Sequence, residues 1–247
     1  MFYRKLNNKV MIGLTFCLLG LVLLTVSLIN NSVLSKEDSI EEFMEIERNV
    51  FYDNKIDSNL DFIKKNEVII IGDSRFEQIV DNYNEYKIPQ NFTFIAKSAM
   101  EVNWFKNTAL NSLNKILNKK SNDKIYHVVI NMGVNDIQKY RPFDSSIKTY
   151  LKEYSKLINQ YDDVHFYLLS INPIVEKKLK VTQPDNVRTN KDIDYFNEKL
   201  MEFSNNNNIS YCPANEAFDF NTDDGIHYTE ETNQVIIDYI ANDCVKY

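Results

Sequence analysis

The sequence predicts an α/β protein in which a parallel five-stranded sheet is covered by helices on both faces. From Glu67 onward, five short apolar runs alternate with longer stretches whose apolar residues recur at helical spacing. The short runs are rich in Val and Ile, and strands separated by helical patterns favour right-handed βαβ crossovers. A chain of 247 residues accommodates one such domain of about two hundred residues plus an appendage.

The strands and helices of this domain are expected to alternate along the chain. The apolar runs predict strands at Val68–Ile71, Phe92–Ala96, Ile125–Asn131, Val164–Ser170 and Ile209–Cys212. The helical patterns lie at Arg75–Tyr83, Asn103–Leu117, Ser145–Gln160, Asp192–Ser204 and Glu230–Ala241. Ligands of such sheets bind beyond the carboxyl ends of the strands. Functional residues are therefore expected directly after the strands.

An apolar run near the N-terminus predicts a transmembrane helix ahead of this domain. Residues 10–29 contain no charge and are long enough to cross roughly 30 Å of hydrocarbon. Basic residues precede the run and acidic residues follow it, so the positive-inside rule puts residues 1–9 in the cytoplasm and the rest of the chain outside. We expect an uncleaved signal-anchor, then a stalk or amphipathic helix over residues 30–66, then the α/β domain over 67–247. A cleaved signal peptide, which would leave a secreted form, is the competing interpretation.

Charge and cysteine content exclude several classes of protein. The net charge of −7 and the pI near 5.1 argue against a nucleic-acid partner, because phosphate backbones require basic patches. Three cysteines are too few for a disulfide scaffold, and no Cys/His cluster indicates a metal site. Cys212 and Cys244 pair only if the fold brings them close, which the sequence leaves open.

Gly72-Asp73-Ser74 directly follows the first predicted strand. Serine is a favoured helix cap, and for Ser74 alone this is the simpler interpretation. The same position presents Ser74 at the carboxyl edge of the sheet, where backbone N–H groups of the next turn can stabilise an oxyanion. Ser74 is thus a candidate nucleophile as well as a candidate cap.

A second motif, NMGVND at residues 131–136, directly follows the third predicted strand. Gly133 permits a turn that other residues resist. Asn135 offers a neutral amide donor, which suits an oxyanion because it brings no charge of its own. Taken alone, an Asn/Asp-rich turn is the preferred interpretation.

A third motif, DDGIH at residues 223–227, lies just before the last predicted helix. The other two histidines, His127 and His165, lie inside predicted strands, where a hydrogen-bonded structural role is expected. A loop allows the Asp224 carboxylate to meet Nδ1–H of His227 and leaves Nε2 free to take a serine proton.

Together, the three motifs resemble the sequence blocks of the SGNH hydrolases, also called GDSL-like esterases. The resemblance covers about Glu67 to the C-terminus and rests on Gly72-Asp73-Ser74, Gly133-x-Asn135-Asp136 and Asp224-x-x-His227. It implies a flavodoxin-like α/β/α sandwich with a Ser–His–Asp triad, no metal and no cofactor. The order Ser, Asp, His also occurs in α/β-hydrolases, but the G-x-S-x-G elbow of that family is missing here.

The chain departs from the SGNH pattern in the second block, where the family usually has a glycine whose N–H joins the oxyanion hole. The corresponding stretch, residues 97–101, contains no glycine. Because the donor is a backbone group, Ala99 is the expected equivalent. The resemblance then implies an oxyanion hole formed by the amides of Ser74 and Ala99 and the side chain of Asn135. Three residues are expected to support its turns: Gly72, Asp73 and Gly133.

These features predict a membrane-anchored extracellular serine esterase. Ser74 is the expected nucleophile and His227 the base, with Asp224 rather than Asp223 orienting it because the D-x-x-H spacing favours Asp224. The family and the surface location favour a substrate in which acetyl or other short acyl groups are carried by cell-surface or environmental carbohydrate or by a cell-wall polymer.

Two other functions remain open. An O-acyltransferase of cell-wall polymer would use the same triad and would need a multi-pass membrane protein to supply acyl groups. A catalytically silent glycan-binding module is favoured only by the missing glycine.

Residues for substrate contact are expected near the strand ends. Arg75 is either an anion-binding residue or a solvated arginine of the first helical turn. Trp104 and Phe105 either face a sugar or belong to the core. The segment Ile174–Lys191, which includes Arg188, is either a flap over the substrate or a surface loop.

Overall fold

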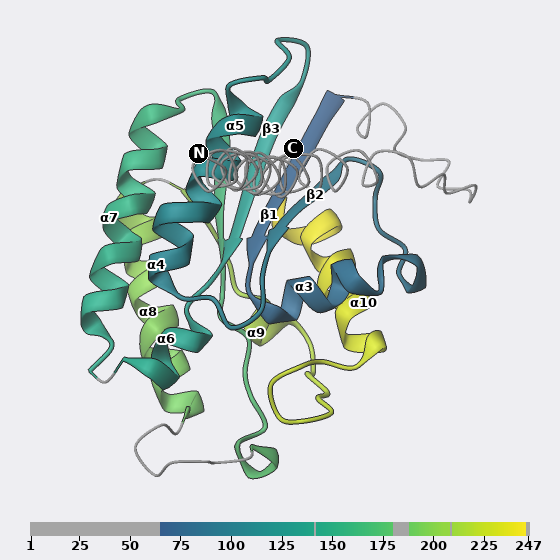
Figure 1. Ribbon diagram of the computed structural model, residues 1–247, viewed down its shortest axis with the longest axis vertical. Helices are drawn as coiled ribbons and strands as arrows, with labels where there is room; N and C mark the ends of the chain where they lie inside the picture. The colour runs from purple at the N-terminus through teal and green to yellow at the C-terminus, as the bar shows by residue number, and fades with distance from the viewer. Residues whose placement is uncertain (1–64, 141, 180–187, 208, 246–247) are drawn as a thin grey trace, which may run out of the picture. The chain divides into compact units, whose positions relative to one another are not determined.

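The computed structural model describes residues 65–140, 142–179, 188–207 and 209–245, which form a three-layer α/β/α sandwich (Figure 1). Its five strands are all parallel and follow the order β2-β1-β3-β4-β5, which is the flavodoxin-like order. The predicted fold of this domain is thereby confirmed. The strands are β1 (Asn66–Gly72), β2 (Phe92–Ala96), β3 (Ile125–Asn131), β4 (Val164–Leu169) and β5 (Ser210–Cys212).

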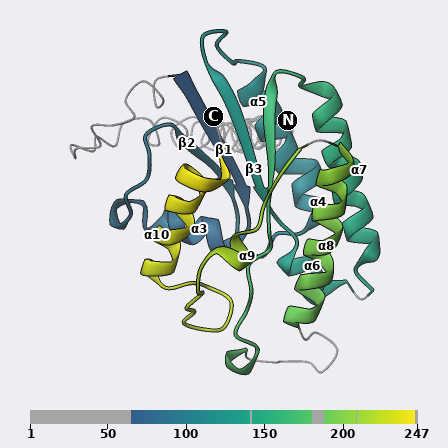
Figure 2. The same ribbon diagram turned by 180° about the vertical axis from the view of Figure 1, so that it is seen from behind.

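Helices cover both faces of the sheet (Figures 1 and 2). One face carries α3 (Ser74–Asp81), α10 (Glu230–Tyr239) and the π-helical turn η4 (Ile240–Cys244). The other face carries α4 (Val102–Trp104), the π-helical turn η2 (Phe105–Ala109), α5 (Leu110–Leu117), α7 (Asp144–Gln160) and α8 (Asn190–Asn207). Four short helices complete the described residues: η1 (Tyr83–Glu85), α6 (Val134–Lys139), η3 (Glu176–Lys178) and α9 (Ala214–Ala217).

The strand β1 shows why the apolar runs of this sequence become central strands. Val68 and Ile70 pack under α3 and α10, whereas Ile69 and Ile71 pack under the helices of the opposite face. All four side chains are almost fully buried, and each contributes about 1.5–3 kcal/mol to folding. A strand covered on both faces has no position for a polar side chain, which explains the continuous run of apolar residues.

Three parts of the predicted secondary structure differ from the structure. The single helix predicted over Asn103–Leu117 is divided by the π-helical turn η2, where the Phe105 ring packs against those of Tyr150 and Tyr154 at 5.2 and 5.5 Å between centroids. The short helices α6 and α9 were not predicted, because four to six residues are too few to show a helical period.

The two strand histidines differ in their surroundings. His127 is buried and hydrogen-bonded to Asn66 Oδ1 at 2.8 Å and to the Tyr167 hydroxyl at 3.1 Å, as expected of a structural histidine. His165 is exposed, and its ring stacks on that of His127 with 5.1 Å between centroids.

The predicted anchor at residues 10–29 and nearly all of the predicted stalk lie outside the described residues. Among the helices that the structure describes, none combines the length and apolar character that crossing a bilayer requires.

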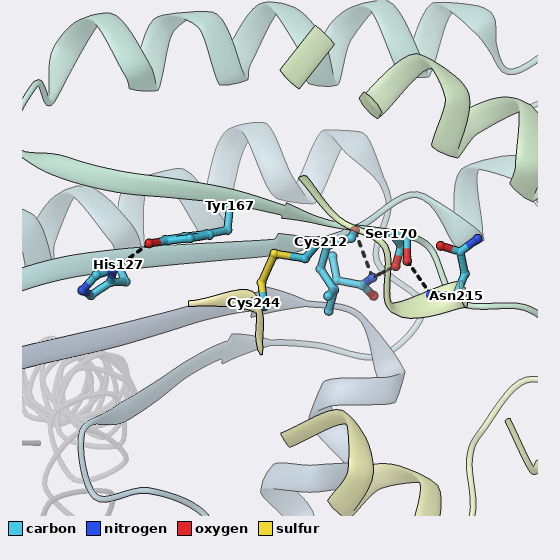
Figure 3. Close-up of a disulfide and its surroundings, with 8 residues drawn as sticks. His127, Tyr167, Ser170, Cys212, Asn215 and Cys244 are labelled. Carbon is cyan, nitrogen blue, oxygen red and sulfur yellow. Dashed lines mark hydrogen bonds between the residues drawn. A yellow bond between two sulfur atoms is a disulfide. The ribbon is translucent and has the colours of Figure 1, made fainter. Parts of the chain in front are cut away.

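Cys212 and Cys244 form a disulfide, which settles the pairing that the sequence left open (Figure 3). Cys212 ends β5 and Cys244 ends η4, and both are buried. The two cysteines are 32 positions apart in the sequence, and Asp224 and His227 lie between them. The bond therefore closes a covalent loop around the segment that carries the third sequence motif.

Replacing both cysteines, in Cys212→Ser/Cys244→Ser, is expected to lower the stability of the domain by about 3–4 kcal/mol, because a loop of this length loses its constraint on the unfolded chain. The measurement is thermal unfolding with and without dithiothreitol. The reductant should lower the melting temperature of the wild type and leave that of the double variant unchanged. Cys17→Ser is the matched control and should respond like the wild type. A double variant with the same melting temperature as the oxidised wild type would contradict the expectation.

Candidate active site

Ser74 is the first residue of α3 and follows the end of β1 by two positions. The N-cap of this helix is Asp73, whose side chain accepts the N–H of Arg75 at 3.1 Å. A Cβ atom at Gly72 would overlap the Phe76 ring, so the close approach of the helix to the strand requires glycine there. Because Asp73 caps the helix, the Ser74 hydroxyl is available for other contacts.

The structure brings Ser74, His227 and Asp224 into one hydrogen-bonded row. Nε2 of His227 lies 3.0 Å from Oγ of Ser74, and Nδ1 lies 2.7 Å from Oδ2 of Asp224. An ionised carboxylate only accepts hydrogen bonds, so Nδ1 carries the imidazole proton and Nε2 is the acceptor that faces the serine hydroxyl. This is the geometry of a nucleophile, a base and an orienting acid.

The loop that carries His227 holds Asp224 in its ionised form. Oδ1 of Asp224 accepts the backbone N–H groups of Ile226 and His227, both at 2.8 Å. Burial raises the pKa of Asp224, but these two bonds and the imidazole contact outweigh it and lower the pKa to about 2. Asp223, the alternative partner, instead donates its backbone N–H to the carbonyl of His227 at 3.1 Å.

The row of side chains is open to solvent at one end. Ser74 is only 8% exposed, whereas the side chain of His227 is 38% exposed. The serine end of the row is therefore packed, whereas the imidazole is in contact with solvent.

Arg75 is a buried structural residue, which corrects both interpretations offered by the sequence. It is 2% exposed, and its guanidinium donates from Nε to the carbonyl of Ile226 at 3.2 Å and from Nη1 to the carbonyl of Asn172 at 3.0 Å. It also lies 4.8 Å from the centre of the Tyr228 ring. Arg75 thus ties the start of α3 to the residues on either side of His227.

Asn135 lies in α6, beyond the carboxyl end of β3. Gly133 adopts a φ of +126°, in the region that favours glycine, and a Cβ atom there would meet the Phe196 ring at 2.8 Å. The resulting turn places Nδ2 of Asn135 3.0 Å from the carbonyl oxygen of Met100. The NMGVND motif is therefore in direct contact with the stretch at residues 97–101.

Ala99 is the only residue other than glycine with a positive φ among the described residues, at +58°. The left-handed conformation is the one that glycine adopts most readily, so the backbone at Ala99 is that of a glycine position. The backbone N–H groups of Ser74 and Ala99 have no acceptor within the described residues. Both remain available as donors for a bound group.

Asp136 connects this loop to the helix α6. Its carboxylate accepts the N–H of Val102 at 3.2 Å and the hydroxyl of Tyr150 at 2.8 Å. Burial raises its pKa to about 6, against the opposing effect of these hydrogen bonds. Asp136 therefore anchors the end of the segment that contains Ala99.

The predicted substrate contacts agree with the structure only in part. Phe105 is fully buried in the core, and Trp104 is partly buried and packs against the same core, so the core interpretation holds for Phe105. Of the segment Ile174–Lys191, residues 180–187 lie outside the described residues.

Sequence reasoning missed the position of Arg188, which is buried at the site. Its Nη2 donates to Oδ1 of Asn135 at 2.8 Å. No sequence signal could have found this contact, since a lone arginine in a long polar segment has no pattern.

No group of three or more His, Cys, Asp or Glu side chains suited to a metal ion occurs within the described ranges.

The chain matches the model of the GDSL-like Lipase/Acylhydrolase family over residues 57–240 and belongs to that family. The resemblance to SGNH hydrolases is thereby confirmed, and with it the class of hydrolase.

Two solved structures with TM-scores above 0.5 share the fold at low sequence identity. An acylhydrolase candidate from Bacteroides fragilis is 17% identical, with a TM-score of 0.55 over 81% of this chain and 93% of its own. A member of the lipolytic protein G-D-S-L family from Veillonella parvula is 16% identical, with a TM-score of 0.51 over 72% of this chain and 97% of its own. The acetyl xylan esterase AlAXEase is 17% identical, with a TM-score of 0.48 over 72% and 100% of the two chains. No curated protein sequence matches the chain significantly.

Ala99→Gly is expected to stabilise the domain by up to about 1 kcal/mol. A left-handed conformation costs a residue with a Cβ roughly 1–2 kcal/mol, and the greater freedom of glycine in the unfolded chain offsets part of the gain. Urea unfolding measures the difference. Ala96→Gly, in the extended strand β2, is the matched control and should destabilise by about 0.5–1 kcal/mol. Equal losses in both variants would show that Ala99 is not a glycine position.

Proposed function

We propose that this protein is a serine esterase with Ser74 as its nucleophile. One observation carries the proposal: Oγ of Ser74 lies 3.0 Å from Nε2 of His227, while Asp224 contacts the opposite ring nitrogen at 2.7 Å. The membership of the chain in the GDSL-like family supports the same reaction class.

Acylation begins when Ser74 Oγ attacks the carbonyl carbon of the ester and its proton passes to Nε2 of His227. Asp224 stabilises the imidazolium that forms. The carbonyl electrons move to oxygen, and the oxyanion accepts hydrogen bonds from the donors around it. When the intermediate collapses, the C–O bond to the alcohol breaks and the imidazolium gives its proton to the leaving oxygen.

Deacylation repeats these steps with water. His227 takes a proton from the water as it attacks the acyl-enzyme, and the imidazolium returns that proton to Ser74 Oγ. The carboxylic acid leaves, and the enzyme is restored with no cofactor consumed.

We assign the oxyanion hole to the amides of Ser74 and Ala99 and to Nδ2 of Asn135. The left-handed backbone of Ala99 supports this assignment, because the family's glycine can be replaced where only an N–H group is used. Loss of one such donor lowers the rate by about 10²–10³. The missing glycine therefore does not favour a silent module.

The proposed location is the outer side of a membrane, with residues 10–29 as the anchor. Two features support it: the uncharged run is twenty residues long, and stable disulfides such as Cys212–Cys244 persist in oxidising compartments. At that location, the proposed substrates are acetyl or other short acyl esters of carbohydrate.

Ser74→Ala and His227→Ala are each expected to lower kcat by more than about 10³-fold, since members of such a row act as a unit. The measurement is hydrolysis of p-nitrophenyl acetate by the detergent-solubilised full chain, followed by acetate release from acetylated glycan. Ser145→Ala, an exposed serine of α7, is the matched control and should retain the wild-type rate.

A serine-directed fluorophosphonate should label the wild type and leave Ser74→Ala unlabelled. If the wild type and Ser74→Ala hydrolyse the ester equally and neither is labelled, the esterase proposal is wrong. Acetate release from glycan that requires Ser74 would support the substrate class.

A further inference from the structure

We propose that Arg188 is a positioning residue for the ester reaction, which holds the side-chain amide of Asn135 in the orientation that an oxyanion requires. The inference rests on the proposed esterase function. It concerns a residue outside the three sequence blocks, brought to the site only by the fold.

The contact between the two side chains is short and buried. Nη2 of Arg188 donates to Oδ1 of Asn135 at 2.8 Å, and Arg188 is 7% exposed while Asn135 is 9% exposed. Arg188 lies next to Thr189, whose hydroxyl accepts the N–H of Asp192 at 3.1 Å in the first turn of α8. The backbone that presents the guanidinium is therefore anchored to a helix of the sandwich.

This contact and the Met100 carbonyl favour the same orientation of the amide. A guanidinium has only donors, so the atom of Asn135 that faces Arg188 must be the carbonyl oxygen. The amide nitrogen then faces the loop of Ala99 and Met100, and one of its two hydrogens is bonded to the Met100 carbonyl at 3.0 Å. The second hydrogen remains for a bound oxyanion.

Without Arg188, only the Met100 carbonyl still favours this orientation, because in the opposite one it would face the Asn135 side-chain oxygen. A rotation of the amide by half a turn exchanges its oxygen and nitrogen, and the two orientations differ little in shape. In the rotated form a carbonyl oxygen would face the developing negative charge, where it repels the oxyanion instead of binding it.

The positive charge of Arg188 also favours hydrogen-bond donation by the Asn135 amide. Burial and the nearby Arg75 lower the pKa of Arg188 to about 10, against the opposing effect of Asp73 and Asp224, so the guanidinium is protonated at neutral pH. A cation on the oxygen of the Asn135 amide draws electron density from it and strengthens its N–H groups as donors.

The guanidinium has unused bonding capacity as well. Nε of Arg188 is buried and has no hydrogen-bond partner among the described residues. The contact with Asn135 is therefore made by Nη2 and not by Nε.

The test is a double-mutant cycle on the detergent-solubilised full chain with p-nitrophenyl acetate. Arg188→Gln is expected to lower kcat by about 10- to 10³-fold, with KM changed less than about threefold. The loss of kcat should not exceed the loss caused by Asn135→Ala. Combining the two substitutions should cost no more than Asn135→Ala alone, because both act through one donor. Lys148→Gln removes a positive charge from the exposed face of α7 and is the matched control, with wild-type kcat expected.

Chemical rescue separates positioning from a merely structural role. Guanidinium chloride at non-denaturing concentration should raise the kcat of Arg188→Ala, with sodium chloride at equal ionic strength as the control. Guanidinium chloride should leave the kcat of the double variant Arg188→Ala/Asn135→Ala unchanged. Arg188→Lys, which keeps a charge and a donor, should retain more activity than Arg188→Gln and covers the case in which the glutamine variant fails to fold.

Two results would overturn the inference while leaving the esterase function intact. One is a wild-type kcat in Arg188→Gln, and the other is a loss that multiplies fully with that of Asn135→Ala. A failure of the esterase function itself is recognised separately, by equal rates in the wild type and Ser74→Ala, and would remove both proposals.

Discussion

The site depends on the buried contact between the start of α3 and the loop that carries His227. Ser74 and His227 are 153 residues apart, yet their side chains meet at 3.0 Å. Arg75 maintains that distance, because its guanidinium binds the carbonyl of Ile226 on one side of the histidine and lies over the Tyr228 ring on the other. A charge buried in this way is stable only while its partners are present, since removing them leaves an uncompensated cation. The loop is therefore held against the helix by an interaction that cannot relax without large cost.

The parallel sheet supplies the second constraint. β1 and β3 are neighbours, with Gly72 in register with Asn131, so the residues that follow both strands emerge at the same edge. Ser74 follows β1 and Asn135 follows β3. Asn172 follows β4, and its carbonyl accepts a hydrogen bond from Arg75. Asp136 and Asn135 then bind the backbone of the segment that follows β2, at Val102 and Met100. Hydrogen bonds from neighbouring strand ends thus order a site that no single loop contains.

The third constraint is covalent. The disulfide between Cys212 and Cys244 joins the edge strand β5 to the last turn of the described chain, and the loop of His227 lies between them in sequence. The short strand β5 has only three residues, so it contributes few ladder hydrogen bonds of its own. The disulfide gives this short strand a covalent link to η4, and Figure 3 draws the bond together with Tyr167 and Ser170.

Local patterns in the sequence were sufficient to predict the sheet and most of the candidate site residues. Val- and Ile-rich runs, helical periods and turn residues are properties of near neighbours, so they predicted the parallel sheet and the positions of Ser74, Asn135 and His227 beyond its strands. Asp224 was predictable as the partner of His227 because only three residues separate them. The burial of Arg75, the orientation of the Asn135 amide by Arg188 and the pairing of the two cysteines were not predictable. Each depends on residues between 32 and 151 positions apart, and such distances close only when the whole sandwich packs.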